Sequence, residues 1–323
     1  MKPYLAPGPA GLCIYLSEKQ LHLALPGILM PMGYKMKQNK TKLWNRNNLK
    51  NPHRIADKKQ RVQAMFSEIA DSYDLLNHLL SLNMDRRWRR RAVEIAQVEA
   101  GQSVLDLCCG TGDLTIEFLQ RQPKLKEIVG IDFTEDMLKI ALVKARVTFN
   151  SRKPFINEAP GSSNDASISE QQYSKANNSH KNLKINWLCA DAERLPLQNE
   201  QYDCVSCAFG IRNLRDPQAG LREAYRLLKP GGKLLILEFT LPDNRWLSLL
   251  YQCYFRLALP LLAGMITQDK SGAYHYLPDS VRSFQTNWKL DMLIFQAGFT
   301  KIHIEKICWG TVLIYKACKP VSE

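Results

Sequence analysis

The sequence predicts an α/β fold, a doubly wound and mostly parallel sheet of seven strands that ends in an antiparallel hairpin. Strand-like and helix-like segments alternate between residues 103 and 239, as they do where helices connect parallel strands. The apolar run at residues 233–239 is nearly continuous, which is typical of a strand buried on both faces. Two strands at residues 301–306 and 309–316 lie close enough in the chain to form a hairpin.

Periodicity places the other elements. Apolar residues recur at three- and four-residue steps from about residue 56 to residue 80, which predicts a helix with one apolar face. A helix at residues 217–228 is followed by Lys-Pro-Gly-Gly at residues 229–232, a helix-stop signal. The remaining predicted strands are residues 103–107, 127–131, 184–189 and 202–208, and the remaining helices are residues 110–119 and 134–147.

Composition and charge exclude some classes of protein. Of the 323 residues, 45% are hydrophobic and 23% are charged, which excludes a disordered chain, and a mean hydropathy of −0.28 argues against several membrane spans. The formal net charge of +13 would suit nucleic acid or an anionic membrane. Residues 1–50, however, hold eight Lys or Arg and one Glu, so more than half of the excess lies there. No nucleic-acid partner is therefore expected.

Charge and composition also divide the chain. We expect residues 1–53 to form a basic, disordered extension and residues 54–323 to form one domain. Residues 150–182 are rich in Ser, Asn, Gln and Ala without periodicity, which indicates a flexible insertion. The nine cysteines form no disulfide framework, so we expect a cytoplasmic protein. The extension is poor in acidic residues, which leaves targeting to an organelle open.

A glycine-containing loop follows the first predicted strand of the sheet. The apolar residues 104–107 lead into a turn of small residues and then into a helix. Gly110 and Gly112 in this turn permit unusual backbone angles and the close approach of a ligand. The N–H groups at the start of the helix point toward whatever binds there. A tight turn that binds no ligand would have the same pattern.

Two further positions fall in register with the loop. Asp132 ends the second predicted strand, 22 residues after Gly110, where a carboxylate can accept both hydroxyl groups of a ribose. Asp191 and Ala192 follow the third strand. The carboxylate of Asp191 could accept a hydrogen bond from the amino group of an adenine, and the N–H of Ala192 could face a ring nitrogen. These positions predict a cofactor that contains a nucleoside.

The charge of the loop decides between two such cofactors. A nicotinamide dinucleotide would place an anionic pyrophosphate against the loop, and its fingerprint usually has a third glycine. Here Asp106 precedes the loop, Asp113 follows Gly112, and no third glycine is present. Two carboxylates suit a ligand with an ammonium and a sulfonium group. We therefore expect S-adenosylmethionine as the cofactor, bound near Asp106, Gly110 and Gly112, and we expect no metal site.

Longer motifs show a resemblance to a known family. From about residue 61 to residue 316 the sequence resembles the ubiquinone/menaquinone biosynthesis C-methyltransferases, which are class I S-adenosylmethionine-dependent enzymes. The motifs are FSEIADSYD at residues 66–74, the loop at 105–115, FGIRNLRD at 209–216, LEF at 237–239 and YLPDSV at 276–281. The resemblance implies a class I methyltransferase fold, which is Rossmann-like, and cofactor contacts at Thr111, Asp132, Asp191 and Ala192.

The resemblance also implies a reaction. A methyl group would pass from S-adenosylmethionine to a ring carbon of a prenylated quinol. We favour the conversion of demethylmenaquinol to menaquinol because the chain is bacterial in style. A benzoquinol of the ubiquinone pathway and a phylloquinone-type substrate are alternatives, as are an RNA-binding methyltransferase and a non-catalytic scaffold. Two residues depart from the family pattern: Cys108 stands where many class I enzymes have Gly or Ala, and Ala208 where some members have a Ser that contacts the cofactor.

The loop at residues 209–216 follows the fourth strand, at the edge where open α/β sheets bind ligands. Arg212 could stabilise a developing phenolate, and Asn213 and Asp216 could position a water molecule or accept the quinol proton. His275 is another candidate base. Each residue also has a structural interpretation: a surface salt bridge for Arg212 and Asp216, a brace of the loop for Asn213, and packing beside aromatic rings for His275.

Two segments bear on the partners. Residues 246–266 are apolar but interrupted by polar residues and a proline, so they form either core or lid helices or a groove for a prenyl tail, and not a membrane span. Residues 86–91 contain five Arg, which form either a solvated helix face remote from the cofactor or a site for anionic lipid. We expect a prenylated quinol as substrate and a peripheral contact with a membrane, and a homo-oligomer is left open.

Overall fold

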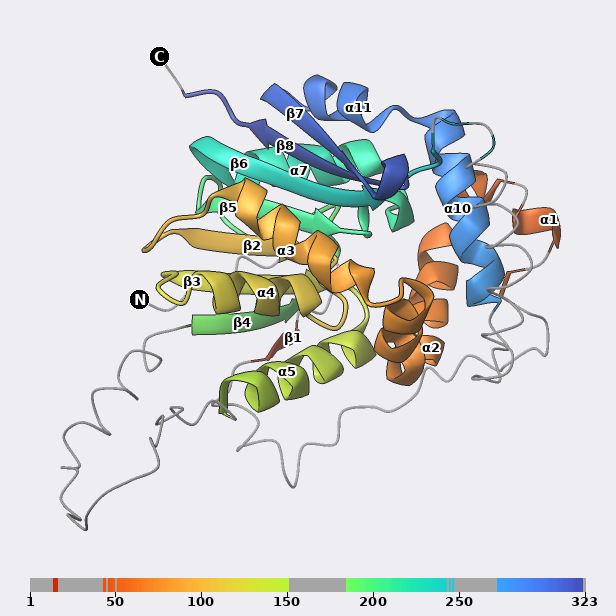
Figure 1. Ribbon diagram of the computed structural model, residues 1–323, viewed down its shortest axis with the longest axis horizontal. Helices are drawn as coiled ribbons and strands as arrows, with labels where there is room; N and C mark the ends of the chain where they lie inside the picture. The colour runs from red at the N-terminus through yellow and green to blue at the C-terminus, as the bar shows by residue number, and fades with distance from the viewer. Residues whose placement is uncertain are drawn as a thin grey trace, which may run out of the picture.

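The computed structural model describes residues 14–16, 43–44, 46–49, 51–150, 184–242, 244, 246 and 272–321. Its strands form one sheet in the order β1-β4-β3-β2-β5-β6-β8-β7 (Figure 1). The strands are β1 Ile14–Leu16, β2 Ser103–Leu107, β3 Glu127–Asp132, β4 Lys184–Cys189, β5 Tyr202–Ala208, β6 Leu228–Phe239, β7 Thr300–Ile307 and β8 Val312–Cys318. Seven of them are the predicted strands, so the predicted fold class is confirmed.

The directions of the strands also agree with the prediction. Strands β4, β3, β2, β5 and β6 run parallel, and β8 pairs antiparallel with β6 and with β7. β1 is an additional short strand that comes from the predicted N-terminal extension and pairs antiparallel with β4. The chain runs from β2 to β3 and β4 and then returns to β5 on the other side of β2. This reversal creates a switch point at the carboxyl ends of β2 and β5, where open α/β sheets bind ligands.

Helices cover both faces of the sheet and its carboxyl edge. They are α1 Arg46–Leu49, α2 Lys58–Leu80, α3 Met84–Ala96, α4 Asp113–Arg121, α5 Glu135–Asn150, α7 Pro217–Leu227, α10 Ala273–Asn287 and α11 Leu290–Gln296, with 3-10 turns η1 Pro52–Arg54, η2 Ile211–Asn213 and η4 Cys308–Gly310. Helices α3, α4 and α5 cover one face, and α7 and α11 cover the other (Figure 1). Helices α2 and α10 lie at the carboxyl ends of the strands, where α10 contacts η1 and η2.

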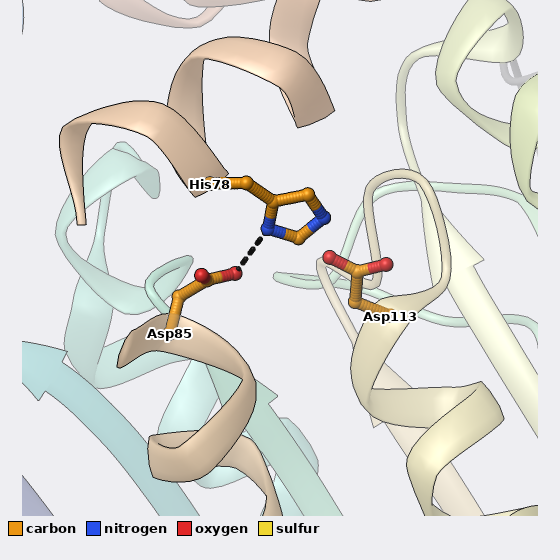
Figure 2. Close-up of side chains that lie close together, drawn as sticks. All are labelled: His78, Asp85 and Asp113. Carbon is orange, nitrogen blue, oxygen red and sulfur yellow. Dashed lines mark hydrogen bonds and ion pairs between the residues drawn. The ribbon is translucent and has the colours of Figure 1, made fainter. Parts of the chain in front are cut away.

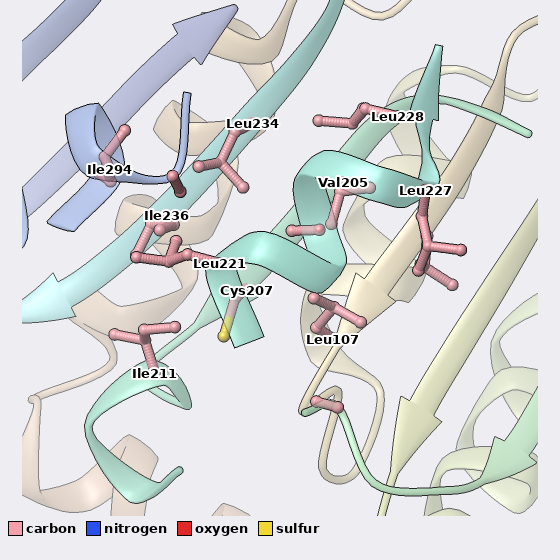
Figure 3. Close-up of a cluster of buried hydrophobic side chains, with 14 of the residues drawn as sticks. Leu107, Val205, Cys207, Ile211, Leu221, Leu227, Leu228, Leu234, Ile236 and Ile294 are labelled. Carbon is pink, nitrogen blue, oxygen red and sulfur yellow. The ribbon is translucent and has the colours of Figure 1, made fainter. Parts of the chain in front are cut away.

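A large apolar cluster joins the sheet to α7 and α11 (Figure 3). Leu107 and Val205 on adjacent strands belong to it, together with Leu221 and Leu227 of α7 and Ile294 of α11, and all five are at most 4% exposed. Full burial of such a side chain contributes roughly 1.5–3 kcal/mol. A second cluster, against α3 and α4, buries the opposite face of the same strands. Burial on both faces explains the apolar runs by which these strands were predicted.

Two local features differ from the expectations. Helix α7 ends at Leu227 and β6 begins at Leu228, so residues 229–232 belong to the strand instead of a separate stop. Trp44, within the predicted extension, is 1% exposed, and its ring centroid lies 4.4 Å from that of Tyr276 on α10. These contacts do not test where the extension ends, so the limits of extension and domain stay predictions.

Some predicted features fall outside the described residues. They are the insertion at residues 151–182, most of residues 1–53 and residues 247–266. In the part of the chain that the structure describes, no helix is long and apolar enough to cross a membrane.

Candidate functional site

A pocket of about 670 Å³, open to solvent, lies at the carboxyl ends of β2, β3, β4 and β5. The carboxyl edge of an open α/β sheet is where small ligands bind in such folds. Helix α2 contributes Lys59, Phe66 and Tyr73 to one wall, opposite the strand ends. The predicted site residues in its wall are Gly110, Asp132, Asp191, Ala192 and Asn213.

The two glycines of the loop have different surroundings. Gly110 has a φ of +55°, and a Cβ added there would meet no atom within 4 Å, although the residue lines the pocket. The backbone therefore leaves open space that a bound molecule can approach closely. Gly112 has a φ of +82°, and a Cβ there would lie 2.7 Å from the Trp187 ring. Gly112 thus permits packing of α4 on the sheet and does not itself line the pocket.

Asp132 connects the end of β3 to the glycine loop. Its Oδ2 accepts a hydrogen bond from the N–H of Gly110 at 2.9 Å, and its Oδ1 accepts one from the N–H of Thr134 at 2.8 Å. Burial raises the pKa of Asp132, while these backbone donors act in the opposite direction. Each carboxylate oxygen retains a lone pair, so the side chain can still accept hydrogen bonds from the hydroxyl groups of a ligand in the pocket.

Asp191 and Ala192 form the wall beyond β4. Oδ1 of Asp191 accepts from the N–H of Glu193 at 3.0 Å, and its Oδ2 lies 2.5 Å from Nζ of Lys59. Ala192 is 5% exposed. The pocket thus contains two carboxylates that can accept hydrogen bonds and the open approach at Gly110, and this arrangement fits the nucleoside of S-adenosylmethionine. Asp132 would hold the ribose, and Asp191 and Ala192 would hold the adenine.

Asp106 and Thr111 lie behind the pocket wall. Asp106 is fully buried and accepts from Oγ1 of Thr115 at 2.6 Å and from Oγ of Ser206 at 2.8 Å. Burial raises the pKa of Asp106 to about 6, although both hydroxyls act in the opposite direction. The hydroxyl of Thr111 donates to Oδ1 of Asp74 on α2 at 2.5 Å. Both residues therefore brace the loop, and neither lines the pocket.

An acidic cluster lies beside the loop. Figure 2 shows His78, Asp85 and Asp113 pointing toward one another from α2, α3 and α4. Arg89 pairs with both carboxylates, and Nζ of Lys144 lies 2.5 Å from Asp113. These two cations hold the pKa of Asp113 below its usual range, although burial opposes them. Because both carboxylates are already neutralised by fixed cations, the cluster does not fit a divalent metal.

This cluster corrects the interpretation of the arginine segment. Arg89 is 7% exposed, and its partner Asp113 directly follows Gly112. The expectation of a solvated face remote from the cofactor loop is therefore wrong for Arg89. The other arginines of the segment are exposed, and Arg91 pairs with Glu305 of β7 at 2.7 Å.

The catalytic candidates separate into two groups. Asn213 lines the pocket, donates through Nδ2 to the Phe209 carbonyl at 3.3 Å and accepts from the Tyr276 hydroxyl at 3.1 Å. Arg212, its neighbour, is 5% exposed and pairs with Glu238 at 2.6 Å. The pair is buried, so the surface salt bridge considered for Arg212 is wrong. The Glu238 carboxylate raises the pKa of Arg212 although burial opposes it, so the guanidinium stays cationic.

Asp216 and His275 do not line the pocket. Asp216 is exposed and caps α7, accepting from the N–H groups of Gln218 at 2.9 Å and Ala219 at 3.1 Å. His275 is exposed in the first turn of α10. The structure thus brings Asn213 to the cofactor residues and places these two candidates elsewhere.

Several pocket residues were not predicted. Phe66 and Tyr73 belong to the apolar stripe of α2, which periodicity alone assigns to a core. Lys59 belongs to the polar stripe, which periodicity alone assigns to solvent. The motif at residues 66–74 was a signal that this helix matters, but it did not indicate which side chains reach the pocket. Phe133 and Met137 follow Asp132 and add apolar surface.

Comparisons with known proteins identify the family of the chain. The sequence model of the ubiE/COQ5 methyltransferase family matches residues 54–158 and 162–319. A demethylmenaquinone methyltransferase of Thermus thermophilus is 40% identical over 79% of this chain and 100% of that protein. One of Deinococcus radiodurans is 38% identical over 75% of this chain and 86% of that protein. A ubiquinone/menaquinone biosynthesis C-methyltransferase of Geobacter sulfurreducens is 36% identical over 81% of this chain and 90% of that protein. The chain therefore belongs to the ubiE/COQ5 methyltransferase family, and its cofactor is the predicted S-adenosylmethionine.

Proposed function

We propose that the protein methylates a ring carbon of a prenylated quinol, and specifically converts demethylmenaquinol to menaquinol. The observation that carries the proposal is one pocket in which the cofactor residues meet an apolar wall of aromatic side chains. Asp132 and Asp191 mark the cofactor end, and Phe66, Phe133 and Phe209 offer flat surfaces for a quinol ring. The names of the Thermus and Deinococcus relatives favour a naphthoquinol over a benzoquinol.

The residues of the pocket would align and activate the substrate. When bound, S-adenosylmethionine supplies a methyl group activated by a positive sulfur. The amide of Asn213 keeps one N–H and one lone pair that no described protein group uses, so it can hold a quinol hydroxyl. Arg212, directly before it in the chain, is paired with Glu238 and holds the loop that carries Asn213. The aromatic side chains of the wall would shield one side of a bound ring from water.

We also propose that the protein contacts a membrane with the edge that bears the pocket. Leu82 and Trp309 are 78% and 83% exposed, and both have positive φ, which is unfavourable for such residues. Nε1 of Trp88 donates to Sγ of Cys308 at 2.9 Å, which joins η4 to the start of α3. Exposed Arg86 and Arg87 follow Leu82 and suit anionic headgroups.

Sedimentation with anionic vesicles should fall for Leu82→Ser and Trp309→Ser, and unchanged sedimentation would contradict the contact. A homo-oligomer stays a prediction.

Quinone analysis in cells tests the reaction. Deletion of the gene should leave a quinone that is lighter by one CH2, and a plasmid with the wild-type gene should restore its mass. The Asn213→Ala variant should not restore it, whereas the exposed control Lys139→Ala should. Unchanged quinones after deletion would contradict the proposed function.

A further inference from the structure

Lys58, the first residue of α2, has an unusual place for a lysine because none of it is exposed. Its Nζ donates to the carbonyls of Arg212, at 2.9 Å, and Leu214, and to Nδ1 of His53 at 3.0 Å. Three acceptors match the three N–H groups of an ammonium. Burial of an ammonium against uncharged acceptors is unfavourable, so packing alone does not explain a lysine here.

The first two acceptors lie on either side of a pocket residue. Asn213 stands between Arg212 and Leu214, at the end of the three-residue turn η2. The carbonyls at the end of such a turn have no following helical N–H to accept from. Lys58 supplies donors to both, and thereby restrains the backbone before and after Asn213.

The third acceptor leads to the other side of the Asn213 amide. The Ser280 carbonyl can only accept, so Nε2 of His53 carries the proton in their 3.1 Å hydrogen bond, and Nδ1 accepts from Lys58. Ser280 lies one turn after Tyr276 on α10. The hydroxyl of Tyr276 donates to Oδ1 of Asn213 at 3.1 Å. The contacts therefore form a closed ring that begins and ends at Asn213.

We propose that Lys58 is a positioning residue for methyl transfer, and that this ring holds the Asn213 amide in the orientation that binds the quinol hydroxyl. The inference rests on the proposed function, in which Asn213 contacts the substrate. Lys58 itself does not line the pocket, so it acts through the loop. Misplacement of a substrate-holding group by about 1 Å can cost roughly a hundredfold in rate.

The protonation of Lys58 gives a signature that a packing role would lack. Burial lowers the pKa of Lys58 to about 7, with Glu193 opposing this shift and Arg212 adding to it. The ionisable groups that face it are His53 from η1, Arg212 from η2 and Glu193 from the segment after β4. A neutral amine has two N–H groups for three acceptors, so one contact of the ring is lost above about pH 7.

The substitution Lys58→Met removes the donors and keeps an unbranched side chain. We expect kcat for the quinol to fall roughly ten- to a hundredfold while the Kd for S-adenosylmethionine changes less than about twofold. The ratio of wild-type to variant kcat should decrease as the pH rises past 7, and this ratio cancels the titration of the quinol itself. The adjacent Lys59→Met is the matched control, because Lys59 pairs with Asp191 and should instead change the cofactor Kd.

A second variant keeps the test decisive if Lys58→Met does not fold. Tyr276→Phe deletes one hydroxyl from the opposite side of the ring and should also lower kcat without changing the cofactor Kd. In a folded double variant the two losses should not multiply, because both act through Asn213. A wild-type kcat in either single variant, or full multiplication in the double variant, would overturn the proposal. Failure of the proposed function would appear differently, as no methylated quinol from the wild-type protein.

Discussion

The guanidinium of Arg212 and the carboxylate of Glu238 form an ion pair in the interior, with Nη1 2.6 Å from Oε1 and side chains 6% and 2% exposed. Nη1 of Arg212 also donates to the Phe209 carbonyl at 2.6 Å. The pair thus joins the end of β6 to the loop that carries Asn213. Arg212, for which a surface salt bridge was the structural alternative, is therefore a fixed internal cation behind the pocket.

Removal of the anionic partner should destabilise the fold. Glu238→Ala leaves a buried guanidinium unpaired, so we expect a loss of roughly 3–5 kcal/mol in the free energy of unfolding, measured with urea. The control Arg222→Ala breaks the exposed pair of Arg222 with Asp216 and should cost less than about 1 kcal/mol. Equal losses for the two variants would contradict an internal role for Glu238.

The two loop glycines should respond differently to an added methyl group. Gly112→Ala places a Cβ 2.7 Å from the Trp187 ring at a φ of +82°, so we expect a loss of roughly 1–3 kcal/mol in stability. Gly110→Ala meets no atom within 4 Å and should lose only about 1 kcal/mol from backbone strain. Its methyl group enters the pocket, however, and should weaken cofactor binding. Urea unfolding measures the stability of both variants, and calorimetry measures their affinity for the cofactor. A larger loss of stability in Gly110→Ala, or a larger loss of affinity in Gly112→Ala, would contradict these roles of the two glycines.

The carboxylate of Asp132 should govern cofactor affinity. Asp132→Asn keeps the shape of the side chain but removes the charge and half of its acceptor capacity, so the Kd for S-adenosylmethionine should rise roughly ten- to a hundredfold. The matched control Asp203→Asn alters an acidic residue near the amino end of β5, at the edge of the sheet opposite the pocket. Asp203 pairs there with Lys229. Calorimetric titration should find the control unchanged, and an unchanged Asp132→Asn would refute the ribose assignment.

Folding should become less stable in acid through His53. Burial lowers the pKa of His53 to about 3, with Lys58 adding to the shift, against an ordinary value of 6.5. Between these values the unfolded chain binds a proton that the folded chain does not, so stability falls as the pH falls below about 6.5. The slope from one such group approaches about 1.4 kcal/mol per pH unit.

The variant His53→Gln isolates this contribution. Urea unfolding of wild type and variant between pH 7 and pH 4.5 should give curves that converge toward acid, because the variant lacks the titrating group. Parallel curves would show that His53 does not titrate abnormally.

The sequence predicted those site residues that topology alone brings together. Asp132 ends β3, Gly110 and Asp191 lie within three residues of the ends of β2 and β4, and parallel strands deliver their carboxyl ends to one edge. Phe66 and Tyr73 were visible only as part of an apolar helical stripe, since periodicity does not distinguish a pocket wall from a core.

Other roles depend on contacts between distant segments. Asp216 precedes Pro217 at a helix start, which is the pattern of an N-cap, and its capping role competes with a catalytic one. Lys58 has no distinguishing local pattern, because a lysine in a polar run predicts solvent exposure. Its burial comes from contacts with Arg212 of η2 and with Leu214 just after it, which lie 154 and 156 residues away in the chain.

Transfer of a labelled methyl group measures the proposed reaction itself. The purified protein would be incubated with S-adenosylmethionine carrying a labelled methyl group and with demethylmenaquinol, with its oxidised quinone and a prenylated benzoquinol in parallel. We predict label on the ring of the naphthoquinol, little on the benzoquinol and none on the oxidised quinone. Absence of label from every quinol, in protein that binds the cofactor by calorimetry, would show that the protein does not methylate quinols.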